Sequence, residues 1–369
     1  MKKIIYAVCA AVLLTACSSE AQRLTVTNPC DFDRLTDLVE IPLADIQSKR
    51  TLKKGQVYEV RNSRHEIIPS QVTSDAKLLF QAGLKARETA TFTIGAGRPQ
   101  TFEPKTTGWL VKERFDDFAW ENDRVAYRIY GQALIAKDGP SNGIDIWYKR
   151  TPELFMNQRY EDELNGVASY HNDNGQGLDN FDVKRTLGAG AMAPYVGGDL
   201  WLNENFVSSE VFDNGPLRTT FRLIYKDIEV EGKHFSESRT ISIDAGSQLS
   251  KVIQEYGFTE PTTVAAGIVM RTADDVLFVD TNKYFIEKVE PKTTKVDGIY
   301  IGLVFPQGIE SVETACGHAL ATTTSQPGQP VVYYTGYGWS QFGFADATAF
   351  QTYLGNFVES LKHPLIISY

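Results

Sequence analysis

The sequence predicts an all-β protein built from two β-sandwich units, a small one followed by a large one. Two observations support this fold class. Short segments in which apolar and polar residues alternate recur at roughly 8 to 12 residues, the spacing typical of antiparallel sandwiches. Helical periodicity is nearly absent, whereas aromatic residues, which favour strands, make up 11% of the 369 residues.

We place the small sandwich at residues 24–98. Residues 56–61 alternate with a period of two, so their side chains point to the two faces of a strand in turn, and the Asn62-Ser63 pair that follows is typical of a turn. A segment with glycine and proline at 95–99 then closes the unit. The expected strands are 24–29, 38–43, 56–61, 67–72, 77–82 and 89–94.

The large sandwich is expected at residues 105–369. Glu231-Gly232 is a turn signal between two strand-like segments, which therefore predict a hairpin. Residues 345–362 depart from the strand pattern, because their apolar residues recur at spacings of three and four. They predict a helix that packs on a sheet and ends before Pro364. The expected strands are 124–131, 144–150, 219–225, 237–243, 267–271, 298–304 and 331–339.

The N-terminus has the pattern of a bacterial lipoprotein leader. Two lysines precede an apolar run at 4–14, which at about ten residues is too short to span a bilayer. Leu14-Thr15-Ala16-Cys17 matches a lipobox, which predicts removal of residues 1–16, lipidation of Cys17 and a tether at 17–23. No aspartate follows the cysteine, which favours an outer-membrane lipoprotein facing the periplasm or the cell surface. A plain secretory signal is the alternative.

Charge and cysteine usage exclude some partners. The formal net charge is -9, and an acidic surface argues against nucleic acid as a partner. Beyond the lipobox the sequence holds Cys30 and Cys316, which in an oxidising compartment either form a disulfide or remain free thiols. The absence of a CxxC pair argues against a structural zinc site.

The densest polar stretch is 170–182, in which His171 lies among carboxylates and glycines. Histidine is the usual acid or base near neutral pH, and glycine lets a ligand approach the backbone closely. The stretch also offers Asp173 and Asp179 as oxygen ligands for a divalent cation such as calcium, although it does not match an EF-hand loop. A solvated loop rich in turn residues is the alternative to both interpretations.

Arginine and aromatic side chains on the predicted strands offer further ligand contacts. Trp147 and Arg150 lie on one strand, and Tyr225 and Arg239 lie on the predicted hairpin. Arginine binds carboxylates through two parallel hydrogen bonds, and aromatic faces suit sugar rings. Cross-strand pairing on a sheet surface explains the same residues without a ligand.

Four segments carry a resemblance to a known family: 123–134 (DRVAYRIYGQAL), 143–150 (GIDIWYKR), 170–190 and 215–225 (GPLRTTFRLIY). They resemble a family of Bacteroidota lipoproteins from polysaccharide-degradation clusters that includes an ulvan oligosaccharide dehydratase. The resemblance implies a large galactose-mutarotase-like β-sandwich, or supersandwich, behind the small one. It also implies a carbon–oxygen lyase whose partner is an acidic oligosaccharide.

Such a lyase eliminates across C4 and C5 of a uronate, so it needs groups that move protons and a cation that neutralises the carboxylate. By this chemistry we expect His171 and Tyr225 to transfer protons, and Arg150, Lys184 or Arg185 to bind the carboxylate. The expected substrate-binding residues are Arg150, Lys184, Arg185, Trp147 and Arg239.

Two other functions stay open at this point. One is a non-catalytic glycan-binding lipoprotein, which a flat aromatic strip with His171 outside it would favour. The other is a glycoside hydrolase, which requires two carboxylates about 5 Å or roughly 6.5 to 9.5 Å apart. A concave pocket that joins His171 to cationic side chains would favour the lyase.

Overall fold

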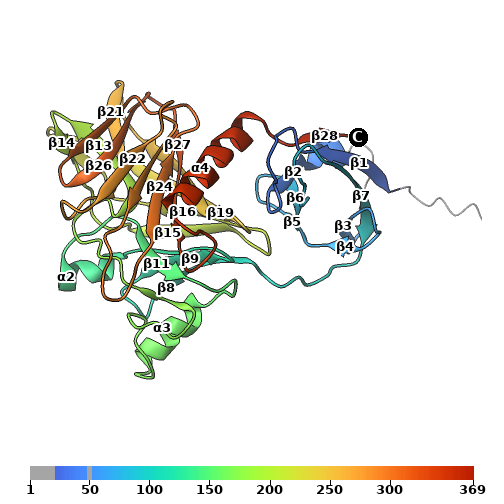
Figure 1. Ribbon diagram of the computed structural model, residues 1–369, viewed down its shortest axis with the longest axis horizontal. Helices are drawn as coiled ribbons and strands as arrows, with labels where there is room; N and C mark the ends of the chain where they lie inside the picture. Colours follow the sequence, from blue (N-terminus) through green and yellow to red (C-terminus); the bar gives the residue numbers. More distant parts are fainter. Residues whose placement is uncertain (1–20, 48–51) are drawn as a thin grey trace, which may run out of the picture.

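The computed structural model describes residues 21–47 and 52–369, and the predicted lipobox with Cys17 lies outside them. Figure 1 shows a smaller and a larger body of strands side by side. No helix of the described residues is long and apolar enough to cross a membrane. The predicted all-β fold, with a small β-sandwich ahead of a large one, is confirmed.

The small sandwich consists of two sheets around its own core. Its elements are β1 (Gln22–Thr27), β2 (Leu38–Pro42), α1 (Leu43–Gln47), β3 (Val57–Arg61), β4 (Ile67–Ile68), β5 (Ser70–Val72), β6 (Lys77–Gln81), β7 (Thr89–Gly97) and β28 (Ile366–Ser368). The sheets run β28-β1-β7-β3-β4 and β2-β6-β5. Alternate residues such as Val26, Phe80 and Ile94 point inward and are buried.

The end of the chain returns to the small sandwich. Strand β28 pairs with β1, placing Ser368 opposite Thr25. The sequence had assigned 105–369 to the large unit as a whole. The difference arises because Ile367 and Leu365 pack against the core of the small sandwich, a contact between distant segments that local pattern does not reveal.

The large sandwich has an eight-stranded sheet as one layer. Its strands are β15 (Ser208–Asn214), β16 (Arg218–Ile224), β19 (Glu237–Asp244), β20 (Leu249–Tyr256), β22 (Val276–Val279), β23 (Phe285–Val289), β24 (Ile299–Val304) and β27 (Val331–Trp339). They run in the order β15-β16-β19-β20-β27-β24-β23-β22. The predicted hairpin is present, because β16 and β19 pair antiparallel with Phe221 opposite Ile241. Its Glu231-Gly232 turn joins two further short strands, β17 (Ile228–Val230) and β18 (Lys233–Phe235).

Two five-stranded sheets form the opposite layer. Their strands are β8 (Thr106–Val111), β9 (Asp117–Asn122), β10 (Ala126–Ile129), β11 (Asp145–Lys149), β12 (Gly177–Asp179), β13 (Ala189–Val196), β14 (Asp199–Leu200), β21 (Thr262–Val269), β25 (Ser311–Ala315) and β26 (His318–Ser325). They run β12-β11-β10-β9-β8 and β14-β13-β21-β26-β25. The core lies between the layers, where Phe118 of β9 stacks on Phe221 of β16 at 4.1 Å between centroids. Two helical turns, η1 (Gln132–Leu134) and α2 (Ile135–Asp138), follow β10.

Helix α4 (Ala347–Lys362) lies on the outer face of the eight-stranded sheet (Figure 1), which confirms the helix predicted over 345–362. The Asp346 side chain accepts a hydrogen bond from the backbone nitrogen of Ala349 at 2.9 Å and so caps its start. A Cβ on Gly302 would lie only 2.9 Å from Leu354, so glycine at this strand position lets the helix approach the sheet.

A buried carboxyl group beneath α4 makes stability depend on pH. Gln351 donates to Glu287 Oε2 at 2.6 Å, whereas Oε1 has no partner among the described residues, and burial raises the pKa of Glu287 from 4.5 to about 7. A carboxyl whose pKa is raised on folding favours the folded state when protonated, so its contribution to stability falls as the pH rises from about 4.5 to about 7. We expect Glu287→Gln to raise the melting temperature by roughly a few degrees near pH 8 and to leave it unchanged near pH 4. An equal change at both pH values would contradict this.

Helix α3 (Met156–Leu164), which the sequence did not predict, covers the outer face of the β8–β12 sheet (Figure 1). Glu121 of β9 accepts hydrogen bonds from the backbone nitrogens of Phe155 at 3.1 Å and Met156 at 2.8 Å, where the helix begins. Tyr160 packs on Trp147 of β11 with their ring centroids 5.0 Å apart. Helix α3 therefore covers the side chains that point outward from this sheet.

Candidate active site

A cluster of buried charged and phenolic side chains lies between the β8–β12 sheet and the segment that contains α3. Strand alternation puts Arg128 of β10, Asp145 of β11 and Asp179 of β12 on the face of the sheet that points away from the core. Arg128 lies directly opposite Asp145 in the β10–β11 register. We call this group the Arg128 cluster, and its members are Arg114, Asp117, Arg128, Tyr130, Asp145, Tyr160, Tyr170 and Asp179.

The Arg128 guanidinium holds the centre of the cluster. Its Nε donates to Asp145 Oδ2 at 2.9 Å, and its Nη2 donates to Asp179 Oδ2 at 2.7 Å. The Tyr130 hydroxyl donates to the same oxygen of Asp145 at 3.0 Å. The guanidinium also lies over the Trp147 ring, 5.2 Å from its centroid. Arg128 is only 3% exposed, so these contacts fix it in one position.

The carboxyl groups of the cluster outnumber its guanidinium groups. Asp117 Oδ2 lies 3.9 Å from Arg128 Nε and 3.8 Å from Arg114 Nη1, so three buried carboxyls share two cations. Burial raises the pKa of Asp117 to about 6. Burial and the neighbouring charge of Asp179 raise the pKa of Asp145 well above its usual range. Carboxyl groups that retain protons near neutral pH are typical of acid–base sites.

Several buried polar atoms around Arg128 have no hydrogen-bond partner among the described residues. Such atoms are rare in folded proteins, because each one costs free energy unless a ligand or water satisfies it. Their concentration around one guanidinium leaves unused hydrogen-bonding capacity there, which water or a polar ligand would satisfy. The atoms are Arg114 Nη1, Asp117 Oδ2, Arg128 Nη1, Asp145 Oδ1, Trp147 Nε1 and Tyr160 Oη.

His171 lies at the exposed edge of the cluster, with 56% of its side chain exposed. Its Nδ1 is 3.0 Å from the main-chain oxygen of Asp179 and 3.6 Å from the Asp179 carboxylate. A carbonyl oxygen only accepts, so Nδ1 carries a proton and Nε2 is left as the nitrogen that accepts one. Arg159 of α3 donates to the main-chain oxygens of Ser169 and Asn172, and so holds the loop that carries the histidine.

A cleft of about 150 Å³ lies beside this loop. Asn180, which follows the last residue of β12, forms part of one wall. Residues of the segment 293–298 also line the cleft, and Lys295 within this segment donates to the main-chain oxygen of His171 at 3.3 Å. Neither His171 nor a member of the Arg128 cluster lines this cleft, and Lys295 only links the His171 loop to the segment that does. Polar residues of the cleft are Asn180, Asp182, Arg271, Glu290, Thr293 and Asp297.

The structure does not bring Asp173 and Asp179 together as cation ligands. Asp173 forms an ion pair with Arg150 at 2.6 Å and accepts hydrogen bonds from the backbone nitrogens of Gly175 and Gly177. Asp179 is bound to Arg128 instead. Across the described ranges, no group of three or more His, Cys, Asp or Glu side chains is arranged to hold a metal ion. The two carboxylates thus serve different arginines, which removes the basis for the calcium site.

Of the two predicted substrate-binding residues on β11 and just after it, Trp147 is buried and Arg150 is partly exposed. Trp147 is completely buried beneath Tyr160 and Tyr170, so its ring is covered and does not offer a face to a sugar. Arg150 keeps 32% of its side chain exposed and contacts Asp173 and Gln341. It remains near the His171 loop, because Asp173 belongs to that loop.

The two cations that follow the His171 loop point elsewhere. Lys184 is 78% exposed, has a positive φ of 51° and pairs with Asp182 at 2.7 Å. The Arg185 guanidinium donates to the main-chain oxygens of Leu202 and Asn203, which ties two loops together. Neither cation contacts the Arg128 cluster.

Tyr225 and Arg239 lie in the core between the two layers, where Arg239 donates to the main-chain oxygen of Met192 of β13. The Arg239 guanidinium sits over the Tyr225 ring at 4.6 Å and pairs with Glu237 at 3.1 Å. Both side chains are almost fully buried, and burial raises the pKa of the Tyr225 hydroxyl. Burial among core residues explains why they do not join His171 in one site.

Both cysteines within the described residues are free thiols, Cys30 buried and Cys316 exposed. Of the two readings left open by the sequence, the disulfide is therefore absent from this structure.

Sequence reasoning missed the centre of the site. Arg128 and Asp145 fall within segments that the sequence predicts as strands, and the strand pattern assigns them no other role. A signal was present, because Arg128 interrupts the apolar and aromatic residues of 125–130, and an arginine buried in such a strand needs a carboxylate partner. Asp145 is that partner because the β10–β11 register places it opposite Arg128, and this register cannot be read from the sequence.

Comparisons with solved structures find the same type of fold in two proteins of Enterococcus faecalis. One is an α-mannosidase of strain V583, with a TM-score of 0.54, 10% identity and coverage of 94% of this chain and 46% of that one. The other is a protein in glycosyl hydrolase family 38, with the same TM-score and identity and coverage of 94% and 47%. This chain spans about half the length of these two proteins, and at such low identity the likeness shows the fold alone.

Comparisons of the amino-acid sequence find a relative that matches the whole chain. A protein of Formosa agariphila described as "Uncharacterized protein P7" is 27% identical over 397 residues, which cover 100% of both chains. Residues 26–367 match the family described as "Domain of unknown function (DUF4861)". Because this match spans both sandwiches and most of the chain, the protein belongs to the DUF4861 family.

Proposed function

We propose that the protein is a carbohydrate-active lyase or dehydratase that acts on uronic-acid oligosaccharides by β-elimination at the Arg128 cluster. The observation that carries this proposal is the contact between His171 and Asp179, which joins an exposed imidazole to a buried arginine with an unpaired Nη1. The fold, shared with glycosidases, and the resemblance to lipoproteins of polysaccharide degradation support a carbohydrate substrate.

The cluster offers each group that the elimination requires. The uronate carboxylate pairs with Arg128 Nη1 and Arg114 Nη1, which stabilise the charge that develops as C5 loses its proton. His171 Nε2 accepts that proton. The electron pair of the C5–H bond forms the C4=C5 double bond while the C4–O bond breaks. The leaving oxygen takes a proton from Tyr130 and departs as water, or as a sugar hydroxyl.

Tyr130 takes the role that the sequence had suggested for Tyr225. Its hydroxyl donates to Asp145 Oδ2 in this structure, so it rotates toward the leaving oxygen to give up its proton, and solvent then replaces that proton. Tyr130 is also partly exposed, whereas Tyr225 is enclosed in the core. The proton donor Tyr130 contacts Asp145 and the proton acceptor His171 contacts Asp179, the two carboxylates that Arg128 binds.

The test is incubation of the protein with a panel of uronate oligosaccharides and matched neutral oligosaccharides. We expect the ultraviolet absorbance of an unsaturated uronate to appear with the uronates alone. Mass spectrometry should show loss of one water, or cleavage without addition of water. Products that gain water would identify a hydrolase instead. Binding of every uronate without any change in mass would overturn the lyase and leave a glycan-binding protein.

A further inference from the structure

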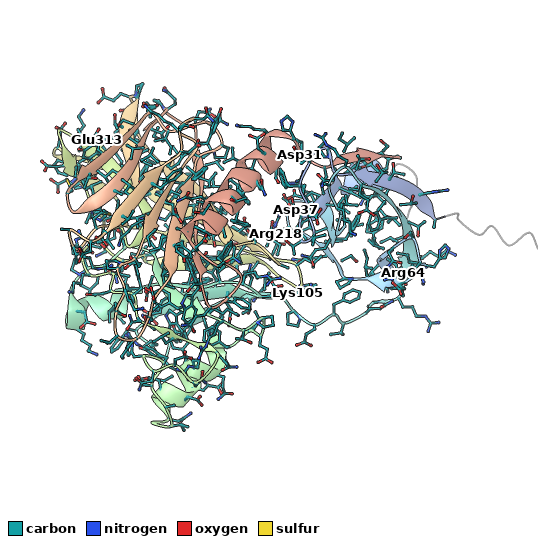
Figure 2. All side chains as sticks on the ribbon, viewed as in Figure 1. Asp31, Asp37, Arg64, Lys105, Arg218 and Glu313 are labelled. Carbon is teal, nitrogen blue, oxygen red and sulfur yellow. The ribbon has the colours of Figure 1, made fainter. Side chains whose placement is uncertain are left out.

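A second and larger cleft, of about 680 Å³, lies between the small sandwich, the eight-stranded sheet and α4. Figure 2 labels Asp37 of the small sandwich and Arg218 of the large one, both of which line it. Its volume is in the range of binding sites for small ligands, roughly 300 to 1,000 Å³. No member of the Arg128 cluster lines it, so the cleft is separate from the proposed catalytic site.

The floor of the cleft is a straight row of side chains across four neighbouring strands. In register, Thr220 of β16 lies opposite Ser242 of β19, Ser242 lies opposite Lys251 of β20, and Lys251 lies opposite Tyr334 of β27. All four line the cleft. Strands are spaced about 4.8 Å apart, so the row spans about 14 Å, which is the length of a short chain of sugar rings rather than of a single one.

Lys251 is the one cation of this cleft without a partner among the described residues. Arg34 is paired with Asp37, Lys77 with Glu40 and Asp75, and Arg218 with Glu40 and Asp244. The lysine, by contrast, is half-buried and makes no ion pair or hydrogen bond. Burial and the charges of Arg218 and Lys77 lower the pKa of Lys251, and a bound anion would offset both effects.

Aromatic rings stand beside the lysine. Tyr334 packs edge to face on Phe357 of α4, with their centroids 4.9 Å apart. Both rings line the cleft, as does Phe212 of β15, which is 37% exposed. An ammonium with hydroxyl groups on one side and an aromatic ring on the other suits a ligand that has an anionic group, hydroxyls and an apolar ring face.

We infer that this cleft is a second, non-catalytic binding site for an acidic oligosaccharide, whose carboxylate or sulfate pairs with Lys251 while a sugar ring lies on Tyr334. The choice of an acidic oligosaccharide rests on the proposed function, whereas the site itself rests on the cleft and the unpaired lysine. Such a site holds a long acidic oligosaccharide on the protein through sugar residues beyond those that the Arg128 cluster contacts.

The test measures binding by calorimetry rather than turnover, with His171→Ala as the parent protein so that no ligand is consumed. The probes are a uronate oligosaccharide, a sulfated oligosaccharide without uronate, and a neutral oligosaccharide of equal length. We expect Lys251→Met to lose one binding site for the acidic probes, or to weaken it at least about tenfold, and Lys251→Arg to retain it. If Lys251→Met loses binding of the uronate probe, the anionic group that Lys251 binds is a carboxylate. If it loses binding of the sulfated probe, that group is a sulfate.

Lys226→Met is the matched control, because Lys226 is an exposed lysine paired with Glu204 and does not line the cleft. A folded Lys251→Met protein that binds all acidic probes like its parent would overturn the inference. Because binding does not depend on chemistry, loss of binding in Lys251→Met together with an inactive wild type would refute only the proposed reaction. An active wild type with binding unaffected by Lys251→Met would refute only the second site.

Discussion

His171→Ala is expected to fold as the wild type does and to lose roughly 10²- to 10⁴-fold in turnover of uronate oligosaccharides, the usual effect of removing one acid–base group. The fold should survive because the side chain is more than half exposed, and its one hydrogen bond, to the main-chain oxygen of Asp179, is at the surface of the cluster. The rate should fall because no other imidazole among the described residues contacts the Arg128 cluster.

The measurement is the rate of unsaturated product formation, alongside circular dichroism and the melting temperature. His234→Ala is the control, because His234 is an exposed histidine on β18. It should leave both rate and stability unchanged. If a folded His171→Ala protein turned over at the wild-type rate, His171 would not be the base. Loss of activity together with loss of structure would instead give the loop a purely structural role.

The strands and the long helix could be predicted because their signal is local. A period of two identifies β3 from residues 57–61, and apolar spacings of three and four identify α4. Helix α3 gave no such signal. Its sequence MNQRYEDEL contains few apolar residues, so the helix depends on Tyr160 packing on Trp147 and on Glu121 binding its first backbone nitrogens. Contacts of this kind join distant segments and leave no periodic pattern.

The candidate site was predicted only at its edge for the same reason. His171 stood out by composition, and the structure places it beside a charged cluster. The sequence correctly placed Trp147 on a strand, but a strand pattern does not reveal that α3 covers the face on which Trp147 lies. Nor could it distinguish Arg239, which faces the core, from Arg128, which faces α3. Both are buried arginines on strands, and only the layer order separates their surroundings.

A buried ion pair anchors α3 over the cluster and should be the most sensitive point for stability. Lys149 Nζ donates to Glu121 Oε2 at 2.6 Å, with the two side chains 0% and 1% exposed. The lysine also lies over the Phe155 ring, 5.0 Å from its centroid. Glu121 in turn accepts from the backbone nitrogens of Phe155 and Met156. One carboxylate thus links β9, β11 and the start of α3.

Lys149→Met is expected to lower the free energy of unfolding by about 3–5 kcal/mol, because it leaves the Glu121 carboxylate buried without its countercharge. Glu121→Gln should cost a similar amount by leaving the ammonium unpaired. The double variant should cost clearly less than the sum of the two, because methionine fills the volume of the lysine and the glutamine oxygen still accepts from Met156. Denaturant unfolding of the four proteins gives this double-mutant cycle.

The surface pair Lys226–Glu204, with side chains 58% and 44% exposed, provides the control. Lys226→Met should cost at most about 1 kcal/mol. Hydrogen exchange then separates a local from a global effect. In Lys149→Met the amides of α3 should exchange faster than those of α4, because α3 loses its anchor while α4 keeps its own cap at Asp346. A cost for Lys149→Met no larger than that for Lys226→Met would show that the α3 anchor lies elsewhere. The local opening of α3 that faster exchange reports would also expose Arg128. Turnover should therefore fall in Lys149→Met, even though Lys149 does not contact Arg128.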